Sequence, residues 1–212
     1  MTRTAQERDL GIIWTPDLKF REEIEETVKK ANNIVGIVRR SFTYMTATSF
    51  KLLFKALVRP HLEYGAPVWN PATLREINRI EGVQRRATKM LPGMKERSYE
   101  ERLKAMDLPT LRFRRLRGDL IEAFKICTGL YKYPPEELLP KNHQNNRTRG
   151  HELKLEKRAA ITTSRLNTFT MRVMTPWNQL PASVIQAPSV NSFKNRLDAN
   201  YKQHPLKFNH NA

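Results

Sequence analysis

The sequence has few of the residues that catalytic and metal sites usually require. Its 212 residues include a single cysteine, Cys127, which excludes a disulfide within the chain and a zinc site built on cysteines. The eight glycines are scattered, so the glycine-rich loops that bind nucleotide phosphates are absent. The five aspartates include no adjacent pair, and the five histidines include no His-x-x-x-His pair. We therefore expect no catalytic residues, no metal, no cofactor and no small-molecule substrate.

Long apolar segments are also missing from the sequence. No apolar run approaches the roughly 18 residues that span a bilayer. The first residues lack the apolar core of a secretory signal peptide. We therefore expect a soluble, intracellular protein that does not enter a membrane.

Positive charge is what the sequence has in excess. The 38 lysines and arginines outnumber the 21 acidic residues, which gives a net charge of +17 and a pI near 10.3. With 39% hydrophobic residues, the chain is apolar enough to fold. Residues 1–19 are electrically balanced, and the excess grows toward the C-terminus. A basic folded surface predicts an acidic partner, either nucleic acid or an anionic membrane surface.

The hydrophobic periodicity predicts a mainly α-helical fold with a five-helix unit over residues 1–130. Apolar residues at three- and four-residue steps predict helices over 20–40, 46–63, 73–91, 98–106 and 108–127. Pro60 should kink the second helix, and Thr73 with Glu76 forms a capping box at the start of the third. A short buried strand is predicted over residues 9–14, ahead of the first helix.

The C-terminal part has a different composition. Residues 131–150 are mostly polar and rich in proline and asparagine, which predicts a linker. A small α+β unit should follow over residues 151–212. It would consist of a strand over 152–157 and helices near 169–178 and 189–202.

One face of the predicted third helix is strongly basic. Its apolar residues fall within one arc, and five cations fall in the opposite arc. Two interpretations are open: the cations follow the phosphates of a nucleic-acid duplex, or they form the solvated face of an ordinary helix. The five candidate nucleic-acid-binding residues are Arg75, Arg79, Arg85, Arg86 and Lys89.

Four further arginines crowd the first two turns of the fifth helix. Cations at this end oppose the helix dipole, which favours anions there, so local helix stability does not explain them. Three interpretations are open: contact with backbone phosphate, a nuclear-localisation patch, or ion pairs with the glutamates of the first helix. The four candidates are Arg112, Arg114, Arg115 and Arg117. By contrast, we interpret Trp69, Trp177 and Cys127 as packing residues.

Five segments in one order carry a resemblance to a known family. They read LGIIWTPDLKF, FKALVRPHLEYGAPVWNP, INRIEGVQRRATKMLPG, SYEERLKAMDLPTLRFRRLRGDLIEAFKI and PWNQLPASVIQAPSVNSFKNRLD. Together they resemble the segment downstream of the palm in reverse transcriptases of non-LTR retrotransposons (LINEs), of the jockey-like and RTE-like kinds. The resemblance spans residues 9–200.

The resemblance implies a thumb and C-terminal extension without the polymerase centre. Phosphoryl transfer in that family needs two metals held by palm carboxylates, including an adjacent aspartate pair that this chain lacks. The chain is therefore expected to be a non-catalytic fragment that grips a primer–template. Its partners would be the backbone of an RNA–DNA or DNA duplex and a palm and fingers domain, in the nucleus. The alternative is a domesticated or relic structural module that binds protein and exposes the unpaired edge of the 9–14 strand.

Overall fold

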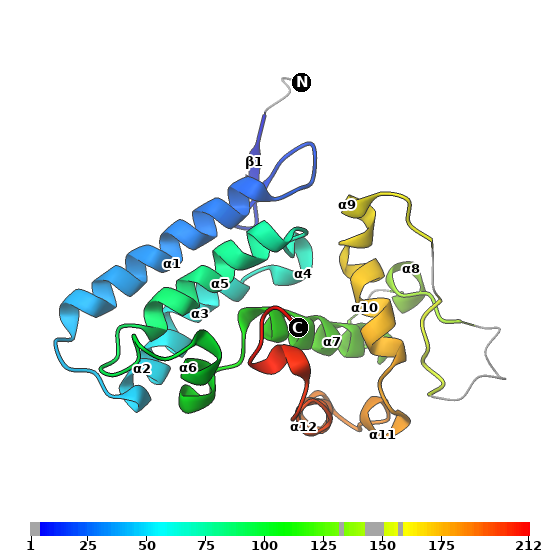
Figure 1. Cartoon of the computed structure of the whole chain (residues 1–212). Helices are drawn as coiled ribbons and strands as arrows, with labels where there is room; N and C mark the ends of the chain where they lie inside the picture. Colours follow the sequence, from blue (N-terminus) through cyan, green and yellow to red (C-terminus); the bar gives the residue numbers. More distant parts are fainter. Residues whose placement is uncertain (1–4, 132–133, 143–150, 157–158) are drawn as a thin grey trace. The chain divides into compact units, whose positions relative to one another are not determined.

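The computed structural model describes residues 5–131, 134–142, 151–156 and 159–212, and the fold is mainly α-helical, as predicted. The chain forms two compact units, shown in Figure 1. The first unit comprises Met1–Arg114 and Pro205–Ala212, and the second comprises Arg115–His204. The division falls inside one helix rather than in the predicted linker over 131–150. Residues 132–133 and 143–150 lie outside the described residues, so the linker stays a prediction.

The first unit contains a two-stranded sheet and a set of helices. The C-terminal residues Pro205–Ala212 belong to this unit and are hydrogen-bonded to Thr110. The Thr110 backbone N–H donates to the Lys207 carbonyl at 2.9 Å, and the Thr110 hydroxyl donates to the Leu206 carbonyl at 2.6 Å. The elements are β1 (Glu7–Asp9), β2 (Ile12–Trp14), α1 (Arg21–Ser41), α2 (Ala47–Leu53), the π-helix η1 (Phe54–Val58), α3 (Arg59–Glu63), α4 (Ala66–Trp69), α5 (Leu74–Thr88), α6 (Tyr99–Met106), the start of α7 (Leu111–Cys127) and the short 3₁₀-helix η2 (Pro205–Lys207).

Helices α1 and α5 lie side by side and build the core of the first unit (Figure 1). The predicted apolar stripe of α1 is buried at Ile24 and Ala31, and that of α5 at Ile80 and Val83. The predicted start of α5 holds, whereas the helix ends at Thr88, before the predicted end at residue 91. Its capping box is present, since Thr73 accepts from the Glu76 N–H and Glu76 accepts from the Thr73 N–H.

The N-terminal strand differs from the prediction. Residues 9–14 do not form one strand, because the chain turns at Leu10 and Gly11, whose φ angles are 47° and 82°. Strand β1 therefore pairs antiparallel with β2, with Asp9 opposite Ile12. Glycine tolerates the left-handed conformation that this two-residue turn requires. The segment thus has a strand partner within its own hairpin, which the sequence analysis did not anticipate.

The helix over residues 46–63 continues through Pro60 by widening into a π-helix. Proline has no N–H to donate to the preceding turn, and its ring crowds that turn. Just before it, the Arg59 N–H donates to the Phe54 carbonyl, five residues back. The wider turn lets helical structure resume and reach Glu63, where the sequence predicted that it ends.

The second unit has its own core. Phe124 stacks on Phe193 with ring centroids 4.3 Å apart, and both rings are buried with Trp177. The predicted helices near 169–178 and 189–202 are present, whereas the 152–157 segment forms, within its described part, a single bridge from Leu155 to Lys141. The elements are the rest of α7, then α8 (Pro135–Leu138), α9 (Thr163–Leu166), α10 (Phe169–Asn178), α11 (Ala182–Ile185) and α12 (Val190–Asn200).

The interpretation of three residues as packing groups is confirmed. Trp69 and Trp177 are fully buried, and their indole N–H groups donate to the carbonyls of Tyr64 and Leu153. Cys127 is buried, and this burial raises the pKa of its thiol to about 12. A thiol protonated at neutral pH is a poor nucleophile, so Cys127 acts as a small core side chain.

Candidate nucleic-acid interface

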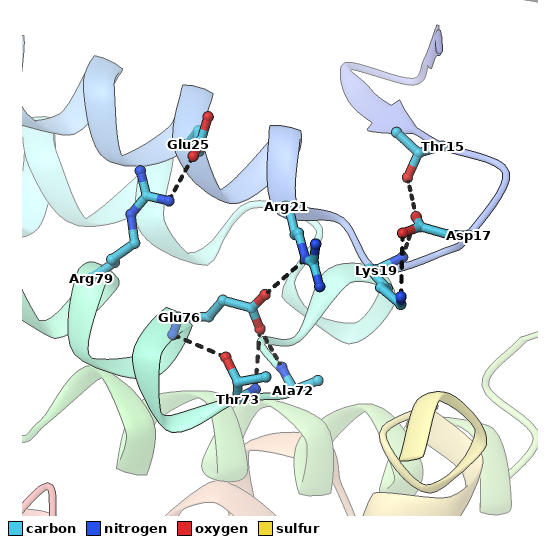
Figure 2. A network of polar contacts seen from close by, with 9 residues as sticks. All are labelled: Thr15, Asp17, Lys19, Arg21, Glu25, Ala72, Thr73, Glu76 and Arg79. Carbon is cyan, nitrogen blue, oxygen red and sulfur yellow. Dashed lines mark hydrogen bonds and ion pairs between the residues drawn. The ribbon is translucent and has the colours of Figure 1, made fainter. Parts of the chain in front are cut away.

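The N-terminal half of α5 carries mixed rather than purely positive charge. Figure 2 shows Arg79 reaching across to Glu25 of α1, with Nη1 2.7 Å from Oε1. That hydrogen bond, with smaller contributions from the charges of Arg79 and Arg75, lowers the pKa of the exposed Glu25 carboxyl. Arg21 lies 4.0 Å from Glu76, the capping residue of α5. Acidic side chains therefore offset the positive charge of the predicted phosphate-binding residues Arg75 and Arg79 at this end of α5.

Arg85 points to another side of α5. Its Nη2 lies 2.7 Å from Nε2 of His210, and its guanidinium lies over the Tyr99 ring, 5.1 Å from the centroid. Burial lowers the pKa of His210, and the charges of Arg85 and Arg112 lower it further. The neutral imidazole then accepts a hydrogen bond from the arginine. Arg85 is thus half-buried against the C-terminal residues and is separated from the other cations of the predicted stripe.

Two arginines of α7 form paired hydrogen bonds with acidic side chains. Within the first unit, Arg114 donates to both carboxylate oxygens of Glu63. Within the second unit, Arg117 donates to both oxygens of Asp198, at 2.5 and 2.7 Å. These partners lie in α3 and α12, not among the predicted glutamates of the first helix. The pairs give a structural reason for cations that the helix dipole disfavours.

The other two arginines of α7 are also engaged by the fold. Arg112 donates to the carbonyls of His210 and Ala212, at 2.9 and 3.0 Å. Arg115 is buried, and its charge offsets part of the effect of burial, which raises the pKa of Asp119. A phosphate would have to displace these contacts before it reached Arg112, Arg114 or Arg117. The phosphate contacts predicted for the four arginines of α7 stay predictions.

A cationic pocket lies where α1 and α5 end. It has a volume of about 380 Å³. Its lining comes from the end of α1 and residues 42–45 on one side, and from the end of α5 and the residues that follow it, up to Lys95, on the other. We call it the basic hollow, and define it by four cations and two aromatic side chains. These are Arg39, Arg86, Lys89 and Lys95 with Phe42 and Tyr44.

The basic hollow has more positive charge than its helix ends require. The C-terminal end of a helix corresponds to roughly half a negative charge, so two ends amount to about one. Four cations line the hollow, and none of the described residues in its lining is acidic. All four are exposed. Arg86 donates to the neutral side chain of Asn32 at 2.8 Å. An excess of about three positive charges therefore faces solvent.

The sequence analysis found half of the cations in the hollow. Arg86 and Lys89 belong to the predicted stripe, and the structure brings them together with Arg39 and Lys95 from other segments. Phe42 and Tyr44 were missed, although their exposed fractions are 46% and 82%. The signal was present in the run RRSFTY over residues 39–44, where aromatic residues follow basic ones between two helices.

Two features that would indicate another kind of site are absent from the described part of the chain. There, no group of three or more histidine, cysteine, aspartate or glutamate side chains is placed to hold a metal ion. No helix within the described ranges is long and apolar enough to cross a bilayer. Comparisons with models of protein families, with curated proteins and with solved structures gave no match.

Proposed function

We propose that this chain is a non-catalytic nucleic-acid-binding module that holds the phosphate backbone of an RNA–DNA or DNA duplex at the basic hollow. The observation that carries the proposal is the gathering of Arg39, Arg86, Lys89 and Lys95 around one pocket without an acidic neighbour in its lining. Other candidate arginines have acidic or carbonyl partners within the fold. Cations that are not paired with an acidic side chain can bind phosphate without first breaking an ion pair.

The choice of nucleic acid among acidic partners has two supports. The net charge of +17 suits a polyanion whose charges repeat along a backbone. The family resemblance points the same way, since it implies the thumb and C-terminal segment of a retrotransposon reverse transcriptase. In that setting the palm and fingers domain would supply the chemistry in the nucleus, and this chain would hold the primer–template. Binding through phosphates should depend little on base sequence.

Titration over a range of salt concentrations tests this proposal. If four cations each contact a phosphate, log affinity for duplex DNA should fall against log salt with a slope of about −3 to −4. Fluorescence anisotropy with a random DNA duplex and an RNA–DNA hybrid of equal length provides the measurement. A flat salt response, or no binding at low salt, would reject the proposal and favour the alternative of a structural or protein-binding module.

A further inference from the structure

The lining of the basic hollow includes two aromatic rings that binding of phosphate does not require. Tyr44 is 82% exposed, and Phe42, two residues earlier, is 46% exposed. A single exposed aromatic ring is normal on a protein surface. Two rings in the lining of one cationic pocket form a different arrangement, because aromatic faces beside cations are the elements that bind unpaired nucleotides.

We infer that the basic hollow binds one unpaired nucleotide, with its base stacked on Tyr44 or Phe42 and its phosphates on the surrounding cations. This rests on the proposed function and names the preferred ligand as a single-stranded segment, such as the overhang beside a duplex. The flat faces of bases inside a duplex are already stacked on their neighbours. Only an unpaired base presents a face to an aromatic side chain.

The size and lining of the pocket fit this ligand. A volume of about 380 Å³ lies near the lower end of the range for small-molecule pockets, about 300–1,000 Å³, and is far too small for a double helix. Met45 and Met90 add an apolar part to the lining, the former buried and the latter half-buried. Methionine is flexible and polarizable, and it packs well against aromatic rings. Such a lining accepts any base, which agrees with weak sequence preference.

Three probes separate the stacking contact from the phosphate contacts. The first is a blunt DNA duplex, the second is the same duplex with a six-nucleotide single-stranded extension, and the third has abasic nucleotides throughout that extension. The second and third probes carry the same number of phosphates. We expect the normal extension to bind roughly 5- to 100-fold more tightly than the abasic one, because stacking of a single base has effects of this size.

Four variants test whether that difference in affinity arises at the hollow. Tyr44→Ala should reduce the preference for the normal extension over the abasic one, whereas Tyr44→Phe should keep it, because the ring remains. Tyr131→Ala, which removes a partly exposed ring outside the hollow, is the matched control and should change nothing. Tyr44 is mostly exposed, so the fold should tolerate its loss. Phe42→Ala combined with Tyr44→Ala should abolish the preference.

The outcomes distinguish this inference from the proposed function. Equal binding of the normal and abasic extensions would overturn the inference, as would an unchanged preference in the double variant. If the salt-dependent affinity persisted in either case, phosphate binding at the hollow would still stand. If none of the three probes bound at low salt, both the inference of base stacking and the proposed function would be wrong.

Discussion

Replacing Arg86 and Lys89 together with alanine is expected to weaken binding to a duplex with a single-stranded extension by roughly 100-fold at low salt. The estimate assigns about 1.5 kcal/mol to each hydrogen bond between a cation and a phosphate. The slope of log affinity against log salt should also become shallower by about 2, because two fewer counterions are released. Both side chains are exposed, so the free energy of unfolding should change little. Anisotropy titrations at several salt concentrations measure the affinity and the slope together.

A charge-matched variant controls for the net charge of the chain. Lys30→Ala combined with Lys104→Ala removes the same two charges from exposed positions outside the hollow, where each lysine pairs with a glutamate four residues earlier. This variant should retain nearly the full affinity and slope. Equal losses in the two double variants would mean that binding follows the total charge, and the hollow would lose its special role.

The second large effect concerns a buried ion pair in the second unit. Asp119→Ala is expected to lower the free energy of unfolding by about 3–5 kcal/mol, a large share of the 5–15 kcal/mol typical of a folded protein. Arg172 donates to both oxygens of Asp119, at 2.8 and 2.9 Å, and both groups are largely buried. Without the carboxylate, the guanidinium would be left in a poorly hydrated site. Urea unfolding of the full chain measures the loss.

A double variant tells whether the penalty comes from the charge left behind. Burial raises the pKa of Asp119 more than the hydrogen bond and charge of Arg172 lower it, which shows that the site disfavours charge. Asp119→Leu combined with Arg172→Met removes both charges and should therefore cost less than Asp119→Ala alone. A double variant that is as unstable as the sum of the two single variants would mean that the pair itself provides the stability.

Local sequence signals predicted the helices well. Thr73 and Ser98 each precede a glutamate by three residues, and both capping boxes are present at the starts of α5 and α6. The apolar periodicity of α1 located the buried Ile24 and Ala31. These features depend on residues within a few positions of one another, so the sequence contains the necessary information. The hairpin of β1 and β2 was missed because residues 9–14 were read across Gly11 as one short buried strand.

The candidate site depends on contacts that local patterns do not contain. Arg114 pairs with Glu63, 51 positions away, and no spacing rule selects that partner over the glutamates of α1. The helical wheel placed Arg85 and Arg86 on one basic face, yet the folded chain turns Arg85 toward His210. The basic hollow joins two stretches of the chain, residues 39–45 and 86–95, so its volume and its lining emerge only from the packing of α1 on α5.

Photocrosslinking locates the bound nucleic acid on the protein. A duplex whose single-stranded extension contains 5-iodouracil should crosslink to an aromatic side chain that stacks on the modified base, and mass spectrometry identifies the attached residue. If the basic hollow is the binding site, the crosslinked peptide contains Phe42 or Tyr44, and the crosslink disappears when Arg86 and Lys89 are both alanine. Crosslinks confined to the arginine-rich start of α7, or crosslinks that survive the loss of Arg86 and Lys89, would contradict the assignment of nucleic-acid binding to the hollow.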